Sequence, residues 1–205
     1  MQFIKKYKIP LLAILVYIAF YSAVSYIKNR FGSHLKNTGP GTQKEFKSFL
    51  QKKKNKETYY KIKKFFRSKK VVRVVPMHQL FRQGTEWRER QMPAFALPPS
   101  KYWKNMVLTL KFLRKEVIPK FGQISIRSGF RSKEYNALAG GVRRSKHLKF
   151  CAVDILLVKK VSQRKLHKTL LQIWKKKGKK YNLGLGLYPG VRFHIDTCGY
   201  RRWKG

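Results

Sequence analysis

Residues 145–158 read SKHLKFCAVDILLV, and the second half of this stretch predicts a buried strand that carries a carboxylate. Residues 152–158 are short, continuous and rich in branched apolar side chains, which is typical of a strand inside a protein core. Asp154 interrupts the apolar run. A carboxylate inside such a strand is costly unless it is paired or binds a metal. The stretch therefore indicates a sheet with a functional polar position.

A second stretch repeats the combination of histidine and aspartate. His147 precedes Asp154 by seven residues, and His194 precedes Asp196 by two in RFHIDT, residues 192–197. Because side chains alternate along a strand, His194 and Asp196 share one face of a second predicted strand. Either pair alone could be a surface ion pair or a satisfied core histidine. Both pairs in apolar strands favour the ligands of a catalytic zinc site, and so a metal-dependent hydrolase.

The charge of the chain is extreme. Its 205 residues include 49 lysines and arginines but 8 aspartates and glutamates, for a formal net charge of +41. Residues 28–70 alone carry 15 basic and 2 acidic side chains, with aromatic residues between the lysines. We interpret this segment as a basic linker or stalk whose counter-charges are anionic lipid or cell wall. No nucleic-acid-binding motif is visible, so no nucleic acid is expected as a partner.

The N-terminus predicts a membrane segment. Residues 9–27 contain no charged side chain and follow Lys5, Lys6 and Lys8, and 19 residues are about the length needed to cross a bilayer. We expect residues 1–27 to be an uncleaved anchor in the inner membrane, with the remainder facing the periplasm or the cell exterior. A signal peptide that is cleaved to release a secreted protein is the alternative.

Residues 71–205 are long enough for one α+β domain with its own core. We expect a central antiparallel sheet with flanking helices, preceded by the N-terminal transmembrane helix. Strands are predicted at residues 71–75 and 123–128, besides those that carry the aspartates. Helices are predicted at residues 100–117 and 162–177, with Gly178 ending the second one. The glycines of residues 184–186 predict close backbone packing.

Three segments of this domain resemble the zinc D-alanyl-D-alanine peptidases of the M15 family. Residues 145–154 match the family's Ser-x-His-x-x-Gly-x-Ala-x-Asp motif, with Phe150 in place of the glycine. SGFRSKEYN, residues 128–136, is similar to the family's Ser-Gly-Tyr-Arg-Ser-x-x-x-Asn segment. GLGLYP at residues 184–189, followed by FHIDT and RRW, resembles the closing block of the family. The resemblance spans about residues 71–205.

The resemblance implies a Zn²⁺ ion held by His147, Asp154 and His194. It implies that Arg131 binds a substrate carbonyl or carboxylate in a charge-assisted hydrogen bond, and that Ser145 supports the first ligand. The implied substrates are peptidoglycan stem peptides or their cross-links, cut next to D-alanine by a carboxypeptidase or an endopeptidase.

The general base departs from the family's patterns. Relatives place an acidic residue three positions before the last ligand or a histidine two before it, and this chain has Val191 and Arg192 there. Asp196 is the first candidate for the catalytic base, although it could equally orient His194. Glu134 is the second candidate. A non-catalytic cell-wall-binding protein on a peptidase scaffold is therefore the alternative function.

Cys151 and Cys198 are the two cysteines of the chain. A pair of cysteines in an exported protein can form a disulfide. Two unpaired, partly buried thiols are the interpretation that we favour from the sequence alone, and a metal-binding role for one sulfur is the third. The sequence does not decide between these interpretations.

Overall fold

The structure is a computed structural model that describes Ser22 and residues 39–205. Residues 39–205 form one compact unit. The membrane segment predicted at residues 1–27 lies outside the described residues, apart from Ser22. In the described part of the chain, every helix is too short or too polar to cross a bilayer.

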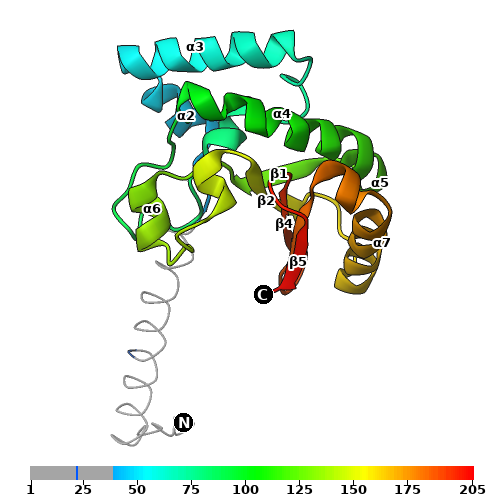
Figure 1. Cartoon of the computed structure of the whole chain (residues 1–205). Coiled ribbons are helices and arrows are strands. Elements are labelled where there is room, and N and C mark those ends of the chain that lie inside the picture. The colour runs from blue at the N-terminus through cyan, green and yellow to red at the C-terminus, as the bar shows by residue number, and fades with distance from the viewer. Residues whose placement is uncertain (1–21, 23–38) are drawn as a thin grey trace, which may run out of the picture. The chain divides into compact units, whose positions relative to one another are not determined.

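Five strands form one mixed sheet at the centre of this unit (Figure 1). Their spatial order is β1-β2-β4-β3-β5. The first four strands pair antiparallel, but β5 runs parallel to β3. The chain reverses direction after β4. Both edges of β4 are already paired, one with β2 and the other with β3, so the returning strand β5 pairs with the remaining edge of β3. The α+β prediction is confirmed, and the purely antiparallel sheet is wrong at this last strand. The strands are β1 (Ile124–Ser128), β2 (Ala152–Leu157), β3 (Gly184–Leu187), β4 (Arg192–Asp196) and β5 (Arg201–Lys204).

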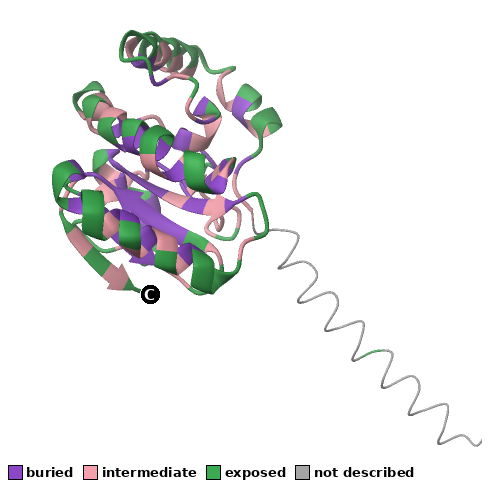
Figure 2. Cartoon of the chain, turned by 90° about the vertical axis from the view of Figure 1, so that its right-hand side faces the viewer, coloured by how far each residue is buried: buried purple, intermediate pink, exposed green. Residues whose placement is uncertain are grey.

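The register gives the sheet one polar and one apolar face. Asp154 is the cross-strand partner of His194, and His194 is also the partner of Gly186. Cross-strand partners point to the same side, so these positions share the polar face. The alternate residues of β2 and β4, such as Ile155 and Phe193, are fully buried. Figure 2 shows buried residues concentrated in the sheet and on the helix sides that face it.

Helices surround this sheet and include both helices that the sequence predicts. A 3₁₀ turn, α4 and a short π-helical segment occupy residues 100–117, where one helix was predicted, and α5 follows them directly. The second predicted helix is α7, which continues beyond Gly178. The helices are α2 (Gln43–Phe49), α3 (Lys53–Ser68), α4 (Trp103–Phe112), α5 (Ile118–Phe121), α6 (Lys133–Leu138) and α7 (Gln163–Tyr181), with 3₁₀ turns η1 (Met77–Phe81), η2 (Ser100–Tyr102) and η4 (Lys146–Lys149) and the π segment η3 (Leu113–Val117).

Two local predictions are wrong for identifiable reasons. A Cβ atom at Gly178 would lie 2.7 Å from a ring carbon of Tyr200, so this glycine serves close packing, and the left-handed Asn182 ends α7 instead. Residues 71–75 form turns rather than a strand. Val71 and Val75 are buried in the core without a partner strand, so burial alone accounts for this apolar run.

Residues 39–70 of the basic segment belong to the compact unit rather than to a separate stalk. Phe46 of α2 and Ile62 and Phe66 of α3 are at most 4% exposed and lie in the core. Ile62 and Phe66 are four residues apart, which places them on one face of α3, while most lysines of this helix are exposed. In Figure 1, α3 lies beside α4. The described unit therefore starts near residue 39, ahead of the boundary expected at residue 70.

Replacing Phe66 with alanine should lower the free energy of unfolding by about 3–5 kcal/mol, the usual cost of removing a buried phenylalanine. The matched control is Tyr60→Ala on the same helix, because Tyr60 is 53% exposed. The control should change stability by no more than about 0.5 kcal/mol. Urea unfolding of the full-length proteins, followed by circular dichroism, measures both. Equal unfolding midpoints for the two variants would show that α3 does not pack on the domain.

Candidate metal centre

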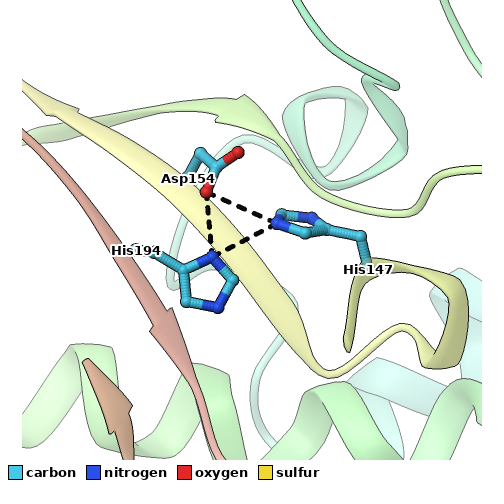
Figure 3. Close-up of side chains that lie close together, drawn as sticks. All are labelled: His147, Asp154 and His194. Carbon is cyan, nitrogen blue, oxygen red and sulfur yellow. Dashed lines mark hydrogen bonds and ion pairs between the residues drawn. The ribbon is translucent and has the colours of Figure 1, made fainter. Parts of the chain in front are cut away.

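Three side chains from two strands and one turn meet on the polar face of the sheet (Figure 3). Asp154 of β2 and His194 of β4 are direct cross-strand partners. His147 comes from η4, the turn that precedes β2. Both imidazoles are buried, and the side chain of Asp154 is 14% exposed. The structure thus brings together the three residues that the sequence analysis proposed as ligands.

The distances between the donor atoms suit one small ion. Asp154 Oδ1 lies 3.4 Å from His147 Nε2 and 2.9 Å from His194 Nδ1, and the two nitrogens are 3.3 Å apart. Donors that bind one zinc ion tetrahedrally at about 2.0–2.2 Å lie roughly 3.3–3.6 Å from one another. Small side-chain movements would therefore complete the coordination. Two nitrogens and one carboxylate oxygen are also the donor types of catalytic zinc sites.

Hydrogen bonds on the far side of each imidazole orient the donor nitrogens inward. His147 Nδ1 lies 2.7 Å from the carbonyl oxygen of Gly129, and His194 Nε2 lies 2.9 Å from Asp196 Oδ2. A carbonyl and a carboxylate accept hydrogen bonds, so the ring proton sits on these outer nitrogens. In the neutral rings the inner nitrogens then present lone pairs toward Asp154. A cation would satisfy all three inward-facing acceptors.

The surroundings favour protonation states that suit metal ligands at His147 and Asp154, but they favour the protonated form at His194. Burial lowers the pKa of His147, and the positive charge of Arg131 lowers it further, so this ring stays neutral. Burial alone would raise the pKa of Asp154, but His147 and His194 hold it well below its usual range. Burial also opposes protonation of His194, yet hydrogen bonds to Asp154 and Asp196 raise its pKa. His194 is therefore the ring from which a cation would displace a proton.

Comparison with known families agrees with this geometry. The sequence model of the family described as Peptidase M15 matches residues 82–189, just over half of the chain. The chain belongs to the M15 peptidase family. No curated protein and no solved structure matches it. The family match includes His147 and Asp154 and ends five residues before His194, which the geometry adds to the site.

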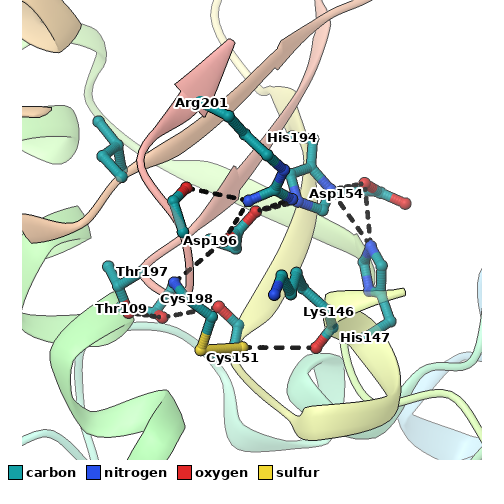
Figure 4. A network of polar contacts seen from close by, with 12 residues as sticks. Thr109, Lys146, His147, Cys151, Asp154, His194, Asp196, Thr197, Cys198 and Arg201 are labelled. Atoms are coloured by element: carbon teal, nitrogen blue, oxygen red, sulfur yellow. Dashed lines mark hydrogen bonds and ion pairs between the residues drawn. A yellow bond between two sulfur atoms is a disulfide. The ribbon is translucent and has the colours of Figure 1, made fainter. Parts of the chain in front are cut away.

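Asp196 of this M15 peptidase occupies the position of an orienting residue behind His194 (Figure 4). Its carboxylate is fully buried, and it accepts hydrogen bonds from His194, from the guanidinium of Arg201 at 2.7 and 3.1 Å, and from the backbone N–H of Cys198. Gly184 makes room for it, because a Cβ atom there would lie 2.2 Å from Asp196 Oδ2. Asp196 does not line the pocket at the metal centre. Of its two proposed roles, the structure favours the orientation of His194.

Arg131 has a role that the sequence analysis did not identify. One of its terminal nitrogens donates to Asp154 Oδ2 at 2.7 Å, and its Nε donates to Ser128 Oγ at 2.8 Å. Arg131 therefore orients the carboxylate of the candidate metal site and also lines the pocket beside it. Ser145 lines the same pocket, but the backbone oxygen of Gly129, rather than Ser145, supports His147.

The pocket beside the metal centre has a volume of about 580 Å³ and a basic wall. Asp154 is the one acidic residue that lines it, and all eight acidic residues of the chain fall within the described residues. Glu134, the second candidate for the general base, is exposed in the first turn of α6 and outside this lining. The described part of the pocket thus has no carboxylate besides the candidate ligand. Its basic lining residues are Arg131, Arg144, Lys146 and Arg201.

Phe150 adopts a backbone conformation that favours glycine, which is the residue that the family motif has at this position. Its backbone is left-handed, with φ of 50°, a conformation that costs a side-chain-bearing residue roughly 1–2 kcal/mol. The ring is fully buried, stacks on Phe66 and Phe81, and meets Phe130 edge-on. Burial of a phenylalanine contributes about 1.5–3 kcal/mol, which offsets the strain. Through the contact of Phe150 with Phe66, the turn that carries His147 packs against α3.

Cys151 and Cys198 form a disulfide (Figure 4). The interpretation of two unpaired thiols is therefore wrong, and a sulfur ligand for the metal is wrong as well. The bond joins the residue before β2 to the turn after β4. Asp154 lies on β2 and Asp196 lies on β4. The disulfide therefore links, at one end, the two strands that carry the candidate metal centre.

Proposed function

We propose that this M15 peptidase is a zinc enzyme that cleaves D-alanine-containing peptidoglycan stem peptides or their cross-links. The observation that carries the proposal is the triangle of donor atoms 2.9–3.4 Å apart in the wall of an open pocket. Membership of a peptidase family supports peptide hydrolysis. The similarity of three sequence segments to D-alanyl-D-alanine peptidases supports the choice of stem peptides.

Some residues of the site would bind the metal, and others would bind the substrate. His147, Asp154 and His194 would bind the ion, and three protein ligands leave a coordination position open. When bound, zinc supplies Lewis-acid polarisation of a peptide carbonyl and of water. Asp196 holds His194 in the productive orientation. The free terminal nitrogen of Arg131, which bonds to no described residue, can donate to a substrate carbonyl as negative charge develops.

The proton of the attacking water needs an acceptor, and this requirement favours a second candidate function. Asp154 Oδ2 already accepts from Arg131, and Asp196 is enclosed between His194 and Arg201. The pocket residues described here offer no further carboxylate. A non-catalytic cell-wall-binding protein with the same metal site is therefore the alternative that we carry forward.

Hydrolysis of wall material should separate these two functions. Purified, zinc-loaded full-length protein should release D-alanine or separate cross-linked peptides from isolated peptidoglycan, as measured by mass spectrometry of the soluble products. A chelator should stop the release, and added zinc should restore it, because the ion supplies the activation of water and carbonyl. Folded, zinc-loaded protein that binds wall material without releasing any product would establish the binding function instead.

We also propose that the protein acts outside the cytoplasm, held by its N-terminal segment to the inner membrane or secreted after cleavage. The uncharged residues 9–27 support this location. The disulfide between Cys151 and Cys198 adds support, since such bonds persist in oxidising compartments.

Attraction to anionic wall or lipid should depend on salt. The full-length protein should co-sediment with purified wall at low ionic strength and release from it as salt rises, because exposed charges are screened. Replacing Lys53, Lys56, Lys61 and Lys64 of α3 with glutamine should weaken this binding without abolishing it, since residues 71–205 carry a net charge of +25. Binding that ignores salt would contradict an electrostatic attachment and indicate recognition of a specific wall component.

A further inference from the structure

A second, smaller pocket adjoins the metal centre. Its volume is about 110 Å³, and it shares Asp154 and Arg131 with the larger pocket, so the two pockets meet at these side chains. Arg127 and Arg192 line the smaller pocket but not the larger one. Three guanidinium groups therefore surround a small hollow next to the candidate metal ligands.

Two of these arginines have no acidic partner. Arg127 and Arg192 form no ion pair within the described residues, which contain every acidic side chain of the chain. The carboxylates that line the smaller pocket belong to Glu86 and Asp154. Glu86 is paired with Arg90, and Asp154 with Arg131. In the part of the chain that the structure describes, Arg127 also has no hydrogen-bond partner for its guanidinium.

A β-bulge and the strand register bring the two arginines together. The pairing of β1 with β2 shifts between Ile126 and Ser128, so Arg127 is the extra residue of a bulge, and bulges redirect side chains. Arg192 lies two residues before His194 and points to the same face of β4.

The proximity of these charges is unfavourable unless an anion joins them. Burial lowers the pKa of Arg127, and the positive charge of Arg192 lowers it further. Arg192 also lies over the ring of Tyr188, 5.0 Å from its centre, which holds its side chain at the edge of the metal-centre pocket. A partly buried cation without a partner costs free energy that a bound carboxylate would recover.

We propose that Arg127 and Arg192 form a carboxylate-binding subsite that selects anionic peptides for the metal centre. The planar guanidinium matches a carboxylate through two parallel hydrogen bonds. This inference rests on the proposed peptidase function, which places the scissile bond at the metal centre. Two residues of β4 span about 7 Å, which equals about two residues of an extended peptide. The recognised carboxylate therefore lies within about two residues of the bond that is cut.

A peptide offers such a carboxylate from two sources. One is its C-terminal carboxylate, which would make the protein a carboxypeptidase. The other is a carboxylate on an internal residue, which leaves the chain end free and suits an endopeptidase. Three synthetic stem peptides distinguish them: one with all carboxylates free, one amidated at the C-terminus, and one amidated at its internal carboxylates.

Binding of these peptides tests the subsite without relying on catalysis. Calorimetry at fixed ionic strength would compare full-length wild type with the double variant Arg127→Gln/Arg192→Gln, both treated with chelator to prevent hydrolysis. The matched control, Arg67→Gln/Arg164→Gln, removes the same charge from exposed positions on α3 and α7. Circular dichroism checks the fold, and the single variant Arg192→Gln alters an exposed side chain only.

We expect the double variant to bind the free-acid peptide ten- to a hundredfold more weakly, the usual loss for a charged hydrogen-bonded pair. The control should change affinity less than about twofold. If amidation of one carboxylate makes wild type and double variant bind with equal affinity, that carboxylate is the one that the subsite recognises. Unchanged affinity in the double variant, or an equal loss in the control, would overturn the subsite. Wild type that distinguishes acid from amide but hydrolyses nothing with zinc would keep the subsite and overturn the peptidase function.

Discussion

Replacing His147 with alanine should remove zinc from the protein and abolish peptide hydrolysis. Wild type should hold one zinc ion per chain through His147, Asp154 and His194, and the variant keeps two of these three donors. Changing a residue that merely supports a ligand costs about 10–100-fold in metal affinity, so losing a ligand should exceed about a hundredfold. Elemental analysis after dialysis gives the stoichiometry, and D-alanine release from stem peptides gives the activity.

His167→Ala is the matched control for this experiment. It also removes one imidazole, but His167 lies on α7 and does not line the pocket of the metal centre. The control should keep one zinc per chain and the wild-type rate. Wild type without zinc, or a His147→Ala variant that retains it fully, would show that the cluster is not the metal site.

Replacing Asp196 with asparagine should weaken zinc binding by about 10–100-fold and slow hydrolysis accordingly. The amide is uncharged, so it removes the ionised acceptor that orients His194 and leaves Arg201 without its carboxylate partner. Zinc titration followed by competition with a chelator measures the affinity. The rate of D-alanine release should be measured across the same zinc concentrations.

The zinc dependence of the rate separates the two roles proposed for Asp196. If Asp196 orients His194, saturating zinc should restore most of the activity of Asp196→Asn. If Asp196 is the general base, the rate should stay low at every zinc concentration, with the affinity unchanged. Glu134→Gln is the control for the loss of one carboxylate at an exposed site, and it should match wild type in both measurements.

The sequence predicted β1, β2, β4 and the ligand cluster because these features depend on local patterns, whereas β3 and β5 were not predicted as strands. Asp154 and His194 each lie in a short apolar run whose alternation shows which side chains share a face. Arg131 stood out through the similarity of its segment to a known motif. Its ion pair with Asp154 depends on the folded chain, and no local pattern shows it.

The packing of α2 and α3 on the domain was not predicted, because the many basic residues of this segment suggested a solvated surface on all sides. Fifteen basic residues between residues 28 and 70 suggested a solvated stalk. Tyr59, Ile62 and Phe66 nevertheless recur at intervals of three and four, the helical spacing that would have identified a packed face. The Arg127–Arg192 pair had no comparable signal, since 49 basic residues give no indication of which two lie together.

The order of the strands determines when the candidate metal centre can exist during synthesis. β4 lies between β2 and β3 in the sheet, yet it is the fourth strand of the chain and ends at residue 196 of 205. Until β4 leaves the ribosome, the edge of β2 that carries Asp154 has no partner, and Asp154 and His147 have no third ligand. Contacts between such distant segments form slowly, because the chain must first close long loops. A nascent chain that lacks β4 therefore carries an incomplete candidate metal site, and proteolysis that removes β4 would take away both His194 and Asp196.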